Sequence, residues 1–220
     1  MNKDVALFKK IRERLFTAVV GDVMDSMGLT HQFLPPCIRP LEEGMTVVGR
    51  AMTVLEEDVN VLDEGNPFGV MFDALDDLKV DEVYLASGSS GAYALWGGLM
   101  STRATRLGAA GAVLNGYHRD TQEIRGMGFP VFSWGGYSQD QRGRGKVVDY
   151  RCPLELRNGV AVNPGDIVFG DVDGVVIVPH DRESEVIEAA LEKVSGEDEV
   201  REAIEGGMST KDAFKRFGIM

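Results

Sequence analysis

The segment 96–120 constrains the fold more than any other, because it joins a glycine-rich loop, a helix and a strand in direct succession. After the loop, residues 99–107 have the composition of a helix, and Gly108 is the residue type that commonly ends one. The next run, 110–114, predicts a strand. Helices and strands that follow each other in this way indicate an α/β domain packed as layers.

Hydrophobic spacing and turn residues predict the remaining elements. We expect helices at residues 5–15, 17–27, 68–78 and 121–125 and from 181 onward, and strands at residues 45–55, 82–86, 130–134, 147–151, 160–162, 167–169 and 174–178. Thr17 is placed to cap the second helix, and Ser209 with Asp212 has the spacing of a capping box before the last helix. The pattern is β-rich with helices at both ends, and we interpret residues 1–220 as one domain.

Composition argues against several classes of protein. Hydrophobic residues make up 44% of the chain and charged residues 26%, which is ordinary for a globular protein. The net charge of −12 argues against a nucleic-acid partner, because phosphate binding needs clustered Lys and Arg. No apolar run approaches the roughly 18–20 residues that span a membrane, and no signal-peptide core follows the first residues, so we expect a cytoplasmic protein. Cys37 and Cys152 form no CxxC pair, so we expect free thiols and no structural zinc site.

The loop 96–98 and the end of the strand after it carry the residues with the clearest chemistry. The first N–H groups of a helix are free and can bind an anion. Gly97 and Gly98 have no side chains, so a ligand can approach the backbone closely there. Arg119 and Asp120 follow the strand at its C-terminal end, where α/β proteins tend to bind ligands. Arginine binds a carboxylate through two hydrogen bonds, and an aspartate oxygen is a natural ligand for a hard cation. These residue types predict a carboxylate on Arg119 that also chelates a metal on Asp120, with a surface salt bridge as the alternative.

Motifs along nearly the whole chain match one known family. They are Thr17-Ala18 with Asp22, Arg39-Pro40-Leu41, Gly49-Arg50-Ala51-Met52-Thr53-Val54, Gly97-Gly98-Leu99-Met100 through Gly108, Gly111-Ala112-Val113, Asn115-Gly116, Arg119-Asp120, Pro130-Val131-Phe132, Val162-Asn163-Pro164-Gly165-Asp166 and Gly170-Asp171-Val172-Asp173-Gly174-Val175. With these motifs the chain resembles the RraA-like family, which includes class II pyruvate aldolases acting on 4-hydroxy-4-methyl-2-oxoglutarate and 4-carboxy-4-hydroxy-2-oxoadipate. The resemblance implies a layered core like that of swivelling β/β/α domains, with flanking N- and C-terminal helices.

The resemblance also implies a site and an assembly. In these aldolases the arginine matching Arg119 binds the substrate carboxylate, and the aspartate matching Asp120 ligates Mg²⁺ or Mn²⁺. Backbone amides in the loop at Gly98, Leu99 and Met100 complete the carboxylate pocket. The metal polarises the 2-oxo group and stabilises an enolate as the carbon–carbon bond breaks. Homotrimers or hexamers with sites between neighbouring subunits are implied.

One departure from the family pattern concerns Gly98. The aldolases carry an acidic residue there, which positions metal-bound water for proton transfer, whereas the branch of the family that inhibits a ribonuclease lacks it. His118 is a candidate substitute because histidine titrates near neutral pH, and an ordinary surface or interface role is the alternative. Arg103 could contact a longer acidic substrate or be a solvated helix residue. Glu197 matches a family position that reaches the metal-bound water of a neighbouring subunit, and it equally fits a solvated acidic helix face.

We therefore expect a divalent-metal-dependent carbon–carbon lyase, an aldolase or an oxaloacetate-type decarboxylase, acting on a small 2-oxo acid. The alternative is a non-catalytic RraA-like regulatory protein that needs no metal and inhibits a partner such as a ribonuclease. Asp171 and Asp173 lie in a turn-like pattern whose spacing does not match an EF-hand loop, so we expect a structural role for them. His31 and His180 have no partner motif, and we expect no catalytic role for either.

Overall fold

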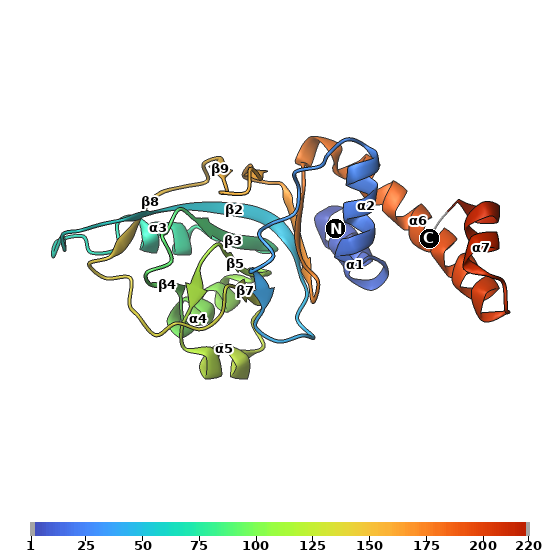
Figure 1. The fold of residues 1–220 in the computed structure, drawn as a ribbon. Coiled ribbons are helices and arrows are strands. Elements are labelled where there is room, and N and C mark those ends of the chain that lie inside the picture. The colour runs from blue at the N-terminus through green and yellow to red at the C-terminus, as the bar shows by residue number, and fades with distance from the viewer. Residues whose placement is uncertain (1–2, 219–220) are drawn as a thin grey trace.

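One mixed β-sheet forms the centre of the computed structural model, which describes residues 3–218 (Figure 1). The strand order is β1-β7-β5-β3-β2-β11-β12, and β8 pairs with the second half of β2. The strands of this sheet are β1 (Arg39–Pro40), β2 (Val47–Asp58), β3 (Glu82–Ser87), β5 (Gly111–Leu114), β7 (Val131–Ser133), β8 (Gly145–Tyr150), β11 (Ile167–Asp171) and β12 (Gly174–Val178). The run β2-β3-β5-β7 is parallel, and the strands outside it pair antiparallel with their neighbours.

Two short strand pairs lie outside the main sheet. β4 (Ala94–Trp96) runs parallel to β6 (Tyr117–His118), and β9 (Leu154–Glu155) runs antiparallel to β10 (Ala161–Val162). The pair β4-β6 was not predicted, because strands of two or three residues are too short to show a period in the sequence. It matters for function, since it brings the loop after β4 beside the loop after β6.

The helices form two groups (Figure 1). They are α1 (Lys3–Arg14), α2 (Thr17–Ser26), α3 (Met71–Asp76), α4 (Gly98–Leu107), α5 (Thr121–Met127), α6 (Glu183–Glu205) and α7 (Thr210–Phe217), with a short 3₁₀ turn at His180–Arg182. The group α3, α4 and α5 lies on the side of the parallel strands, whereas α1, α2 and α6 pack beyond β11 and β12, and α7 follows at the far end of α6. No helix within residues 3–218 has the length and apolarity that crossing a bilayer requires.

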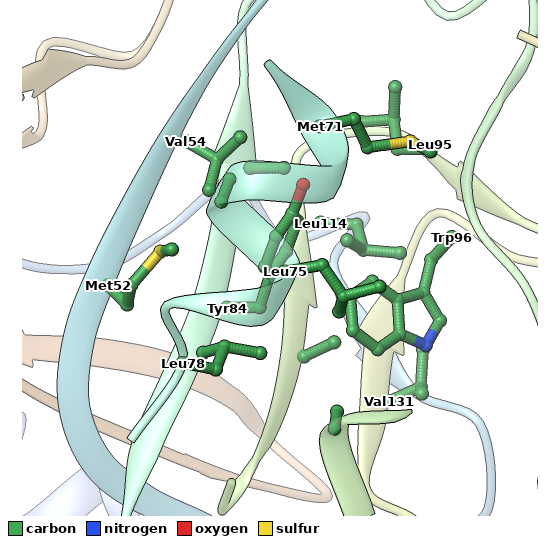
Figure 2. Close-up of a cluster of buried hydrophobic side chains, with 14 of the residues drawn as sticks. Met52, Val54, Met71, Leu75, Leu78, Tyr84, Leu95, Trp96, Leu114 and Val131 are labelled. Carbon is green, nitrogen blue, oxygen red and sulfur yellow. The ribbon is translucent and has the colours of Figure 1, made fainter. Parts of the chain in front are cut away.

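A hydrophobic core under α3 and α4 anchors the start of α4. Side chains from α3, β2 and β3 meet there with Trp96, the last residue of β4 (Figure 2). The ring of Trp96 is fully buried, with its centroid 4.8 Å from that of Tyr84. Its indole Nε1 donates a hydrogen bond of 2.6 Å to Ser101 Oγ in α4. Because an aromatic ring of this size is costly to expose, these contacts hold the glycine loop in place.

The second helix is capped by a distant strand rather than by its own first residue. The backbone N–H and the hydroxyl of Thr17 donate to the two carboxylate oxygens of Asp171, both at 2.7 Å. Phe16 occupies the N-cap position, so the prediction that Thr17 caps this helix is wrong. Asp171 also accepts a bond of 2.9 Å from the N–H of Asp173, which confirms the structural role expected for this turn.

The predicted fold class is confirmed. The structure is a mixed α/β arrangement with a nearly closed, barrel-like sheet and flanking helices. The helix predicted at 68–78 is shorter than expected, since α3 covers only six residues. The capping box before α7 is confirmed, because Ser209 Oγ accepts from the N–H of Asp212 at 3.1 Å. Both cysteines are free thiols, as predicted.

Candidate functional site

The pairing of β4 with β6 joins the two halves of the predicted site. Trp96 lies opposite His118 in this parallel pair, so the next residues of each chain segment, Gly97 and Arg119, lie side by side. The N–H of Arg119 donates to the carbonyl oxygen of Trp96 at 2.9 Å. The glycine loop and the Arg-Asp dipeptide therefore meet at the C-terminal ends of two parallel strands, β4 and β6, whereas the sequence predicts the dipeptide at the end of the strand at 110–114.

The side chain of Asp120 connects the two loops. Its carboxylate oxygen Oδ2 accepts a hydrogen bond of 2.9 Å from the N–H of Gly98, in the first turn of α4. The sequence predicts a ligand anion on the N–H of Gly98, whereas in the structure this N–H binds the carboxylate of Asp120. A Cβ atom on Gly97 would lie 2.7 Å from Asp120 Oδ2, so only glycine allows the approach. Asp120 also has a φ of 60°, a left-handed conformation that is uncommon outside glycine and recurs at functional sites.

Arg119 lies between two carboxylates. Its Nη1 atom is 3.0 Å from Asp140 Oδ1, and its Nε atom is 3.7 Å from Asp120 Oδ2. The side chain remains 38% exposed, so the guanidinium can still contact a ligand. The salt bridge that the sequence left as an alternative is therefore present, and it coexists with an accessible cation. A ligand carboxylate would compete with Asp140 for the same guanidinium fork.

These residues form one end of a cavity of about 300 Å³. The opposite walls are apolar and come mainly from α3 and the first turn of α4. The lining comprises Phe68, Met71, Phe72, Leu75, Ala94, Leu95, Trp96, Gly97, Leu99, Met100, Arg119, Asp120, Asp140 and Gln141. Leu99 is 83% exposed and Phe72 is 59% exposed at its rim. A carboxylate of a small ligand fits the polar end of this cavity, where it would meet Arg119, and the carbon skeleton of the ligand would meet the apolar walls.

A buried carboxyl group lies behind Gln141. Gln141 Nε2 donates a hydrogen bond of 2.9 Å to Glu56 Oε2, and both side chains are buried. The other oxygen of Glu56 has no partner within the described residues. Burial raises the pKa of Glu56 to about 8, and the negative charge of Asp58 adds to the effect. Glu56 is therefore largely protonated at neutral pH and fixes the amide of Gln141 at the cavity wall.

The structure brings some predicted residues into the site and leaves others outside. His118 is buried, and its ring nitrogens lie 2.7 Å from Ser133 Oγ and 3.0 Å from Thr121 Oγ1. His118 does not line the cavity and is an interior residue, and its burial lowers its pKa. Arg103 donates to Asp76 at 2.7 Å and does not line the cavity.

Glu197 lies on α6, where Lys193 is 3.8 Å away. It does not line the cavity, which α3, α4 and the loops beside them form at the other end of the molecule (Figure 1). Within one chain, Glu197 therefore has no part in the site.

The groups present at Asp120 fit a hard divalent cation. Asp120 Oδ2 is held by the N–H of Gly98, while Oδ1 has no partner within the described residues and is free to bind. No group of three or more His, Cys, Asp or Glu side chains within residues 3–218 is arranged to enclose a metal. Mg²⁺ and Mn²⁺ bind well through one carboxylate, with substrate oxygens and water completing the shell. The donor set matches that mode of binding rather than a cage of protein ligands.

Sequence reasoning missed Asp140 and Gln141. Both lie on the loop before β8, outside any motif, and only the folded chain brings them to the cavity. The aromatic wall from Phe68 and Phe72 was also missed, because apolar residues in a helix indicate a core as readily as a ligand pocket.

Sequence comparison with known proteins identifies the family and several relatives. Residues 17–177 match the RraA-like family, described as Aldolase/RraA. A protein of Halalkalibacterium halodurans named "Putative 4-hydroxy-4-methyl-2-oxoglutarate aldolase" is 30% identical over 186 residues, which cover 84% of this chain and 82% of the relative. Protein DlpA of Legionella pneumophila is 30% identical over 198 residues, or 90% of this chain. The chain spans only 31% of the length of DlpA.

A solved structure supports the fold. RraAS2 of Streptomyces coelicolor, described as an unusual member of the RNase ES inhibitor RraA protein family, superimposes with a TM-score of 0.79. The alignment covers 91% of this chain and 98% of that protein at 23% sequence identity. At this identity the likeness shows a common fold and carries no conclusion about activity.

Proposed function

The chain belongs to the RraA-like family, and on that premise we propose that it is a divalent-metal-dependent carbon–carbon lyase acting on a 2-oxo acid. The proposal covers both aldol cleavage and decarboxylation of an oxaloacetate-type acid. One observation carries it: Arg119 and Asp120, neighbours in the chain, present an accessible cation and a carboxylate to the same cavity. The aldolase name of the Halalkalibacterium relative points in the same direction.

The residues of the chain bind and orient the substrate in this proposal. Arg119 holds the substrate carboxylate, assisted by the N–H groups of Leu99 and Met100, which lie in the first turn of α4 and have no intrahelical acceptor. Asp120 holds Mg²⁺ or Mn²⁺ next to that carboxylate. The chemistry that such a cation supplies is polarisation of the 2-oxo group, which stabilises the enolate. The apolar walls limit the access of water to the reacting carbon.

Pyruvate release tests the proposal. The purified protein is stripped with EDTA and assayed on oxaloacetate and on 4-hydroxy-4-methyl-2-oxoglutarate, with and without added Mg²⁺ or Mn²⁺. Metal without protein is the blank, because divalent cations decarboxylate oxaloacetate slowly on their own. We expect protein-dependent turnover that requires the metal. The absence of turnover on both acids would contradict the lyase proposal and favour the alternative of a non-catalytic binding protein.

A proposal on the assembly rests on the role that the family resemblance implies for Glu197. Because this side chain lies on α6, away from the cavity of its own chain, it could serve a site only in a neighbouring copy. We propose a closed homotrimer or hexamer with sites at the contacts between subunits. The exposed apolar side chains of Leu99 and Phe72, at the rim of the cavity, are consistent with such a contact.

A further inference from the structure

We propose that Glu123 is the catalytic proton-transfer group of this site, an inference that rests on the proposed lyase function. Its side-chain carboxylate lies against Gly98, the residue between Gly97 and Leu99; those two residues line the cavity, and Glu123 lies beside that lining rather than in it. No motif in the sequence indicates this residue, which lies in α5 three positions after Asp120.

The carboxylate of Glu123 lies where the side chain of residue 98 would be. A Cβ atom on Gly98 would lie 2.1 Å from Glu123 Oε2, 2.4 Å from Cδ and 2.8 Å from Oε1. The whole carboxylate of Glu123 therefore occupies the space that a side chain at position 98 would fill. The backbone of Gly98 does not require glycine, since its φ lies outside the left-handed region. The absence of a side chain at position 98 thus makes room for the carboxylate of Glu123.

One helical turn carries both acidic groups of the site. Asp120 is the N-cap of α5, and Glu123 lies three residues later, so both side chains project toward the start of α4. Asp120 accepts a hydrogen bond from the N–H of Gly98, and the carboxylate of Glu123 lies against the Cα of the same residue. The two carboxylates therefore both lie against Gly98.

Glu123 has no protein partner that would explain its position. Within the described residues it makes no hydrogen bond and no ion pair. The nearby cations are engaged elsewhere, because Arg125 contacts Glu42 at 2.7 Å and Arg119 contacts Asp140 at 3.0 Å. Glu123 is also exposed, so a ligand can reach its carboxylate.

Aldol cleavage requires such a group. In a 4-hydroxy-2-oxo acid, the Glu123 carboxylate takes the proton of the C4 hydroxyl, and C4 becomes a carbonyl as the C3–C4 bond breaks. The electron pair of that bond remains on C3, and Glu123 returns the same proton to C3, which gives the methyl group of pyruvate. The step is balanced and needs no further reactant. Decarboxylation of oxaloacetate needs only the return of a proton to C3.

The test is Glu123→Gln, which keeps the size of the side chain and removes its capacity to carry a proton. We expect kcat for aldol cleavage to fall by about 10²–10⁴-fold, the usual contribution of a positioned acid–base group, and kcat for decarboxylation to fall less. The dissociation constant for Mn²⁺ and the melting temperature should stay unchanged. Gln122→Ala, at an exposed neighbour in α5, is the control and should match the wild type.

Moving the carboxylate provides a second test. The single variant Gly98→Asp would place a side chain where the Glu123 carboxylate lies, so its aldol cleavage activity should fall. In the double variant Gly98→Asp with Glu123→Ala the new carboxylate has room, so kcat for aldol cleavage should be at least tenfold higher than in Glu123→Ala. Aldol cleavage by Glu123→Gln within threefold of the wild type would overturn the proposal. A tenfold weaker affinity for Mn²⁺ in that variant would also overturn it, because Glu123 would then be a metal ligand. A wild-type protein without any turnover would instead overturn the lyase function itself.

Discussion

Replacing the buried Glu56 by glutamine should remove much of the pH dependence of folding stability. Burial raises the pKa of Glu56 to about 8 in the folded protein, compared with 4.5 as its ordinary value. The folded state therefore binds the proton more tightly than the unfolded state does between these two values. The free energy of unfolding consequently falls as the pH rises through this window, and the contribution is lost above about pH 8.

The size of the effect follows from the two pKa values. A separation between 4.5 and about 8 corresponds to a contribution on the order of 5 kcal/mol, at 1.36 kcal/mol for each pKa unit. Roughly 3 kcal/mol of this is lost between pH 6 and pH 9. Glutamine keeps an oxygen that can accept the bond from Gln141 Nε2 and carries no charge at either pH.

Urea unfolding of the wild type, Glu56→Gln and Glu57→Gln at pH 6, 7.5 and 9 measures this difference. Glu57 is the exposed neighbour of Glu56 and serves as a control. We expect the wild type and Glu57→Gln to lose roughly 3 kcal/mol more than Glu56→Gln between pH 6 and pH 9. Parallel pH profiles for the wild type and Glu56→Gln would refute the assignment of a protonated Glu56.

Three further predictions concern the proposed site and assembly. Arg119→Lys keeps the charge but loses the two-pronged grip, so binding of the 2-oxo acid should weaken by about 1–3 kcal/mol; an unchanged KM and kcat would show that Arg119 does not hold the carboxylate. Asp140→Asn removes a competitor at the half-exposed Arg119 and should lower KM by about two- to fivefold, the range of a surface ion pair; a KM that stays the same or rises would rule out this competition. Light scattering at micromolar concentration should show a trimer or hexamer, and a monomer would count against a site that includes Glu197 of a neighbour.

The sequence predicted the elements that depend on local order and missed those that depend on distant contacts. The strand β2 and the helix α6 begin close to where they were expected, β2 because its residues are rich in β-branched types. The capping of α2 could not be predicted, since Asp171 lies 154 residues from Thr17 along the chain. A local rule identified Thr17 as the cap because it considers only neighbouring residues.

The candidate site shows the same division. Arg119 and Asp120 were predicted together with the glycine loop, and the structure places them beside one another through the parallel pair β4-β6. The carboxylate of Glu123 over Gly98 could not be predicted, because it depends on how α4 and α5 approach each other. Nothing in the sequence alone connects a missing side chain in one helix with an unpaired carboxylate in the next.

The most direct test of the central claim is a titration of the stripped protein with Mn²⁺, followed by electron paramagnetic resonance, for the wild type and Asp120→Asn. Asparagine tolerates the left-handed backbone of this position, and its side-chain oxygen can still accept the hydrogen bond from the N–H of Gly98. The variant therefore removes the negative charge and keeps the conformation of the loop. We predict that the wild type binds Mn²⁺ and that pyruvate tightens this binding, and that Asp120→Asn weakens it by at least about tenfold. Equal affinity for Mn²⁺ in the two proteins would contradict the assignment of Asp120 as the metal ligand.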